Sequence, residues 1–87
     1  MLFIRSSQFK SDYIKADNGI RAKVDERLKI FAKDEFSQIL NNHKLKFNLD
    51  GYRSINITGD WRIIYRKLDI STCFLYRLGT HHQLFGK

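Results

Sequence analysis

The 87-residue sequence contains no proline and a single cysteine, Cys73. One cysteine cannot form a disulfide bond within the chain, so a scaffold held by internal disulfides is excluded and a reducing cytoplasm is the expected location. Because proline is absent, breaks between elements must come from the five glycines and from Asn, Asp and Ser clusters. No apolar run reaches about 18 residues, which predicts no membrane-spanning helix and no membrane partner. The apolar residues at positions 2–4 are too few for a signal peptide.

The apolar content is sufficient for a packed core. Hydrophobic residues make up 43% of the chain and aromatic residues 14%, which is too much for a disordered tail. A chain of this length forms one domain, expected here over residues 1–87, and buries only roughly 60% of its unfolded surface. We therefore expect modest stability.

The net charge is strongly positive. Sixteen Lys and Arg residues against nine Asp and Glu residues give +7. The excess lies in residues 41–87, which hold eight basic and three acidic residues together with all three histidines. A basic surface on a small domain favours polyanionic partners, foremost nucleic acid. Charge alone would also fit a plain basic RNA-binding module.

The first half of the chain predicts a strand followed by two helices. Residues 2–5 form a short apolar strand, and Ser6 or Ser7 can cap the helix that follows. A turn at 17–19 leads to a second helix over 20–33. Its apolar residues recur at steps of four, four and three, which is one helical stripe: Ile20, Val24, Leu28 and Phe31.

The second half predicts strands. Residues 36–49 suggest a helical turn near 37–40 followed by a loop, and a period of two begins after the turn at 50–51. Strands are expected over 54–58, 61–66 and 72–78, followed by a polar tail over 79–87. The order β-α-α-β-β-β predicts an α+β fold with a mostly antiparallel four-stranded sheet and a helical hairpin on one face.

Four segments resemble the YafQ-like branch of the RelE/ParE toxin superfamily. They are 43–45 (His-Lys-Leu), 51–53 (Gly-Tyr-Arg), 59–65 (Gly-Asp-Trp-Arg-Ile-Ile-Tyr) and 77–86 (Arg-Leu-Gly-Thr-His-His-Gln-Leu-Phe-Gly). The resemblance implies a compact RelE-like microbial ribonuclease fold and a type II toxin–antitoxin toxin. It further implies cleavage of mRNA in the ribosomal A site without a metal or other cofactor, and neutralisation by a cognate antitoxin protein.

The resemblance also implies roles for individual residues. The family's catalytic positions match five residues here: His43, Asp60, Arg77, His81 and Phe85. The family often has a further histidine where this chain has Asn56, and Asn cannot exchange a proton near neutral pH, so it can only orient or hydrogen-bond. RNA contacts are expected from Asn56 and from further basic and aromatic residues: Lys44, Lys46, Arg53, Trp61 and Arg62.

These residue types suit RNA cleavage without a metal. The 2′-hydroxyl of the substrate attacks the adjacent phosphate, a base removes its proton, an acid protonates the leaving 5′ oxygen, and a cation stabilises the phosphorane. Histidine has an unperturbed pKa near 6.5 and can serve as acid or base. His43 and His81 are therefore the expected pair, with Asp60 orienting one of them and Arg77 as the cation. Which histidine is the acid stays open.

Other interpretations remain. A ParE-like toxin that inhibits DNA gyrase would share the fold without using proton-transfer groups. Asp60 can simply close its turn, and Trp61 can cover the core instead of stacking on a base. Three histidines and one cysteine make a poor metal-ligand set, and His82 is expected to be a bystander.

Overall fold

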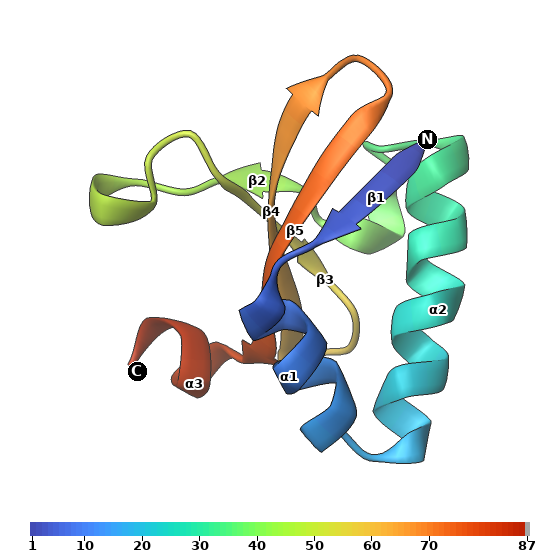
Figure 1. Ribbon diagram of the computed structural model, residues 1–87, viewed down its shortest axis with the longest axis vertical. Helices are drawn as coiled ribbons and strands as arrows, with labels where there is room; N and C mark the ends of the chain where they lie inside the picture. The colour runs from blue at the N-terminus through green and yellow to red at the C-terminus, as the bar shows by residue number, and fades with distance from the viewer. Residues whose placement is uncertain (87) are drawn as a thin grey trace.

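A five-stranded sheet in the order β1-β5-β4-β3-β2 forms the centre of the fold (Figure 1). The computed structural model describes residues 1–86. Its strands are β1 (Leu2–Arg5), β2 (His43–Lys44), β3 (Arg53–Asn56), β4 (Trp61–Asp69) and β5 (Thr72–Thr80). β1 pairs with β5 in parallel, and the other neighbours pair antiparallel, so the sheet is mostly antiparallel, as expected.

Two helices supply the other half of the core. The Ser6 hydroxyl accepts a hydrogen bond from the Phe9 amide and begins α1 (Ser7–Lys15). Asp17 caps α2 (Asn18–Lys33) in the same way. Phe9 and two residues of the predicted apolar stripe of α2 are buried against alternate residues of β3, β4 and β5. The buried cluster comprises Phe9, Ala16, Val24, Phe31, Leu40, Ile55, Ile57, Ile63, Tyr65, Cys73, Leu75 and Leu78.

Cys73 lies fully inside this core. Burial raises the pKa of its thiol to about 12, and the nearby Glu35 carboxylate adds to the rise. A thiol of this kind is an unreactive apolar side chain. Cys73 is therefore a small buried residue of β5.

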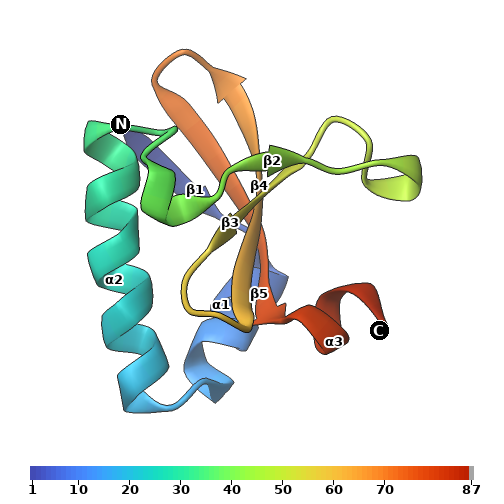
Figure 2. The same ribbon diagram turned by 180° about the vertical axis from the view of Figure 1, so that it is seen from behind.

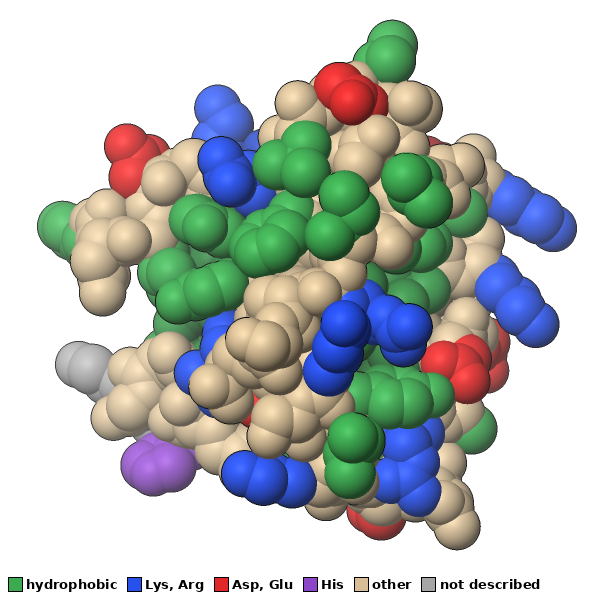
Figure 3. Space-filling model, in the orientation of Figure 1, with side chains coloured by type: hydrophobic (Ala, Val, Ile, Leu, Met, Phe, Trp, Pro, Cys, Tyr) green, Lys and Arg blue, Asp and Glu red, His purple; other side chains and the backbone are tan. Residues whose placement is uncertain are grey.

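The opposite face of the sheet carries aromatic residues that are only partly covered. Phe74 and Tyr76 stack on each other, Tyr52 contacts Tyr76, and the Arg66 guanidinium lies over the Tyr52 and Phe74 rings. Figure 3 shows hydrophobic side chains gathered in the middle of one face of the molecule, with Lys and Arg around them.

The structure corrects the predicted elements in two places. The sheet has five strands instead of four, because residues 43–44 pair with 53–54 as β2 in a stretch predicted to be a loop. A two-residue strand is too short to give a periodic pattern. Residues 81–85 form a helix, α3 (His81–Phe85), in a stretch predicted to be a polar tail; Lys87, the last residue of that tail, lies outside the described residues. Within residues 1–86, no helix has the length and apolar character needed to cross a membrane.

Candidate functional site

β2 and α3 bring two histidines to one cleft. The loop that follows β2 and the helix α3 leave the sheet on the same side, as the two opposite views agree (Figures 1 and 2). A cleft of about 270 Å³ lies between them. Four predicted site residues line it, namely His43, Arg62, His81 and Phe85, and three residues that were not predicted complete it, namely Asn41, Leu45 and Ser54.

The backbone just before β2 fixes the tautomer of His43. The short 3₁₀ helix Gln38–Leu40 ends at Asn41, which takes up a left-handed conformation with φ of 45°, and Asn tolerates this region better than most residues. The Asn41 carbonyl lies 2.9 Å from Nδ1 of His43. A carbonyl can only accept, so Nδ1 carries the proton and donates it. Nε2 of the neutral ring is therefore a hydrogen-bond acceptor.

A partly buried hydrogen-bond network anchors Asn42, the residue next to His43. Nδ2 of Asn42 donates to the Tyr65 hydroxyl at 2.6 Å, and that hydroxyl donates to Glu35 at 2.9 Å. Nε of Arg53 donates to the side-chain Oδ1 of Asn42 at 2.7 Å. Burial and the Glu35 carboxylate both raise the pKa of Tyr65, so its hydroxyl stays protonated. The network ties the start of β2 to the core.

Three contacts position α3, which carries His81 and Phe85. Thr80 and Gln83 form a capping box, each side chain accepting from the other residue's amide. The His81 amide donates to the Asp60 carbonyl at 2.9 Å, which joins α3 to the β3–β4 turn. A Cβ on Gly79 would lie 3.1 Å from side-chain atoms of Gln83 and Leu84, so any larger residue would force these α3 side chains to shift.

Arg62 supplies the guanidinium of the cleft. In the sheet register it lies between Asn56 of β3 and Gly79 of β5, directly beside the base of α3. Its Nη1 donates to the carbonyls of Thr58 and Gly59 at 3.1 and 3.0 Å, which ties the guanidinium to the β3–β4 turn. A fixed positive charge therefore lies in the same cleft as the two imidazoles.

Ser54 forms part of the cleft as a buried polar residue. It pairs with His43 across the β2–β3 ladder, so the two side chains share a face of the sheet. Its hydroxyl is fully buried and has no hydrogen-bond partner within residues 1–86; the same holds for Oδ1 of Asn56. The alternation of Ser54 and Asn56 with Ile55 and Ile57 is the sequence signal that marks this polar face.

The structure places Arg77 outside this cleft. Its Nε donates to Asp12 of α1 at 2.9 Å, and the same carboxylate accepts from the Leu78 amide at 2.9 Å. Burial opposes ionisation of Asp12, but the hydrogen bonds from Arg77 and Leu78 outweigh it and lower the pKa of the carboxyl. Arg77 and Trp61 line a separate hollow of about 290 Å³ beside α1.

The other predicted residues surround the cleft. Trp61 packs partly buried against the core, which fits the interpretation of a core cover. Asp60 is exposed and touches α3 through its backbone. Lys44 and Arg53 line a third hollow, and Lys46 is exposed on the loop after β2. Within residues 1–86, no three His, Cys, Asp or Glu side chains are grouped so that they could hold a metal ion.

Known proteins share this sequence and fold. A family model described as "Bacterial toxin of type II toxin-antitoxin system, YafQ" matches residues 2–86. Comparison with curated proteins gives no match. The crystal structure of YafQ from E. coli strain BL21(DE3) is 25% identical with a TM-score of 0.82, each chain being covered to 97%.

Two solved complexes are also similar to the chain. In the E. coli DinJ–YafQ toxin–antitoxin complex the matching chain is 25% identical with a TM-score of 0.78, and the alignment covers 97% of this chain and 96% of that one. In the heterotetrameric YoeB–YefM toxin–antitoxin complex from Staphylococcus aureus the matching chain is 28% identical with a TM-score of 0.76, and the alignment covers 93% of this chain and 98% of that one. With a family match over nearly its whole length and the same fold, the chain belongs to the YafQ family of bacterial type II toxin–antitoxin toxins.

Proposed function

We propose that the chain is an endoribonuclease that cleaves mRNA in the ribosomal A site, using histidine acid–base catalysis without a metal. The observation that carries the proposal is the single cleft lined by His43, His81 and Arg62. Two groups able to transfer protons and one fixed cation are what attack by the 2′-hydroxyl requires.

His43 acts as the base in this proposal. Its Nδ1 proton is engaged by the Asn41 carbonyl, so the neutral ring offers Nε2 to the 2′-hydroxyl. His81 then acts as the acid and gives a proton to the leaving 5′ oxygen. The Phe85 ring, whose centroid lies 5.0 Å from that of His81, forms an apolar wall beside it.

Arg62 stabilises the phosphorane, because it lies in the cleft with both histidines. Arg77 is held by Asp12 and contributes to catalysis only by stabilising β5; it could contact the phosphate only if this ion pair opened. The Ser54 hydroxyl and the Asn56 amide oxygen have no hydrogen-bond partner within residues 1–86, but both are buried, so they would reach RNA only if the cleft opens. Trp61, Lys44, Lys46 and Arg53 then contact more distant parts of the RNA.

The test is inducible expression followed by mapping of mRNA 5′ ends. His43→Ala and His81→Ala should abolish new ends and growth arrest, since each proton-transfer group typically contributes about 10²–10⁴ in rate. His82→Ala is the matched control, because His82 is an exposed neighbour on α3 that does not line the cleft. Undiminished cleavage by His81→Ala refutes the assignment. Damaged DNA without mRNA cuts would instead indicate the gyrase-directed activity.

The proposed partners are mRNA, the ribosome and a cognate antitoxin. The similar E. coli and S. aureus toxins were solved in complexes with DinJ and YefM. The net charge of +7 favours both RNA and an acidic segment of an antitoxin. Isothermal titration with the product of the neighbouring gene should give tight binding, and its absence would count against an antitoxin encoded there.

A further inference from the structure

The loop between β2 and β3 carries an aromatic side chain that the fold does not use. Phe47 is 90% exposed, and its backbone takes a left-handed conformation with φ of 62°. Bulky side chains rarely adopt this conformation, which glycine takes without strain. A residue that is both strained and exposed contributes little to folding, and such outliers gather at functional sites.

The loop projects from the sheet on the same side as α3 (Figure 1), whose residues His81 and Phe85 line the histidine cleft. Leu45 lines both that cleft and the third hollow, which lies at the base of the loop and has a volume of about 230 Å³. Lys44, Gly51 and Tyr52 also line the third hollow. An extended strand that leaves the cleft over Leu45 therefore enters this hollow and reaches the loop.

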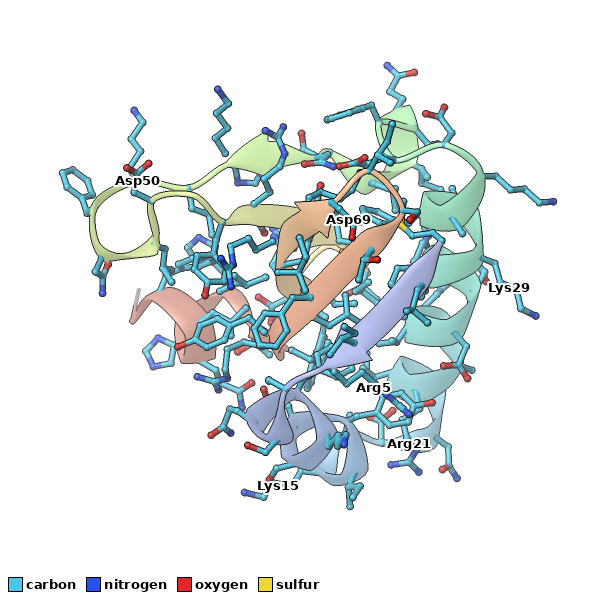
Figure 4. The ribbon with its side chains drawn as sticks, turned by 45° about the horizontal axis from the view of Figure 1, so that its top comes forward. Arg5, Lys15, Arg21, Lys29, Asp50 and Asp69 are labelled. Atoms are coloured by element: carbon cyan, nitrogen blue, oxygen red, sulfur yellow. The ribbon has the colours of Figure 1, made fainter. Side chains whose placement is uncertain are left out.

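Charge along the loop suits a nucleic acid strand. Lys44 and Lys46 are exposed and alternate with Leu45 and Phe47, so positive charges lie next to apolar surfaces. Single-stranded RNA is bound by this combination of cations for phosphates and rings for bases. Asp50 lines the same hollow and lies on the projecting loop (Figure 4). Its carboxylate repels phosphate, but Lys44 and Lys46 leave residues 44–50 with a net positive charge.

We propose that residues 44–47 form an RNA-binding arm. The Phe47 ring stacks on a base of the substrate strand outside the catalytic cleft, and Lys44 and Lys46 neutralise the neighbouring phosphates. The arm thereby holds nucleotides that flank the scissile linkage. This inference rests on the proposed ribonuclease function, because the strand is taken to emerge from the histidine cleft.

The test uses a short single-stranded RNA with a 2′-deoxy nucleotide at the cleavage position and 2-aminopurine at flanking positions. The full chain should quench 2-aminopurine at one flanking position, and Phe47→Gly should abolish quenching and weaken binding about tenfold. Phe47→Trp should retain both. Ile70→Ala is the matched control, because Ile70 is 92% exposed on the β4–β5 turn and should leave binding unchanged.

Stability measurements separate the arm from a structural role. Phe47→Gly relieves the left-handed strain, so its urea midpoint should be equal to or above that of the wild type while RNA binding falls. The arm is refuted if Phe47→Gly binds RNA as the wild type does, if the wild type gives no quenching, or if Phe47→Gly weakens only antitoxin binding. Quenching by the wild type without any mRNA cleavage would refute the nuclease and leave the arm standing. If the wild type cleaves mRNA and Phe47→Gly cleaves it with an unchanged KM, the arm is refuted and the nuclease stands.

Discussion

The ion pair between Asp12 and Arg77 predicts a specific loss of stability. The Asp12 carboxylate is 10% exposed and accepts hydrogen bonds from Arg77, from the Leu78 amide and from Gln8. A hydrogen bond to a charged group contributes about 1.5–3 kcal/mol. Because the Arg77 side chain is 31% exposed and partly screened by solvent, we expect Asp12→Asn to cost about 2 kcal/mol, in the lower half of that range. For a domain of this size that corresponds to a Tm lower by about 8–16 °C.

The contribution of the Asp12 carboxylate to stability should decrease as the pH falls. The pKa of Asp12 is lower in the folded protein than in the unfolded chain, where it is about 3.9. The carboxylate therefore contributes stability that is fully present above the unfolded pKa and is lost as the pH falls through the folded pKa. Thermal unfolding of the wild type between pH 7 and pH 2 should show this loss, and Asp12→Asn should show less of it. Asp50→Asn, which removes an exposed carboxylate from the projecting loop, should leave the stability unchanged.

A double-mutant cycle tests whether the pair itself is responsible. Asp12→Asn and Arg77→Met should be coupled by about 1 kcal/mol, because each single variant already breaks the same contact. The reasoning would be refuted if the two losses of stability were additive and Asp12→Asn lost as much stability at low pH as the wild type.

The same variants report on catalysis. If Arg77 acts only through the structure of β5, Arg77→Met should keep the wild-type kcat at temperatures far below its Tm, where it is folded. A direct contact between Arg77 and phosphate would instead make the kcat of this variant lower.

Two further changes address the supports of the cleft. Gly79→Ala should displace α3, because its new Cβ would lie 3.1 Å from Leu84, and should lower mRNA cleavage more than the urea midpoint; Gly59→Ala is the control, since nothing lies within 4 Å of its Cβ. Asn42→Ala removes the bonds to Tyr65 and Arg53, so it should cost about 1–3 kcal/mol in urea unfolding and reduce cleavage by releasing β2. Unchanged cleavage by Asn42→Ala would mean that the network does not hold His43.

Elements with a long periodic pattern were predictable from sequence, and those that carry the site were not. The stripe from Ile20 to Phe31 predicts α2, and the alternation from Ser54 onward predicts β3 and its polar face. The capping signal of α3, a Thr followed three residues later by Gln, is present at 80–83 and is the one local pattern that indicates where this helix begins. No local pattern reveals that Asp12 binds a residue 65 positions later, so the position of Arg77 was not predictable.

The cleft is built from weakly patterned pieces held by strong local contacts. A two-residue strand and a five-residue helix cannot be stable alone, so both depend on the parts of the fold to which they are attached. His43 depends on the Asn42 network, and His81 depends on the Asp60 carbonyl and on close packing at Gly79. A substitution that loosens either attachment therefore separates the two imidazoles without removing either of them. Activity should then fall before the core, formed by the long strands and α2, loses its stability.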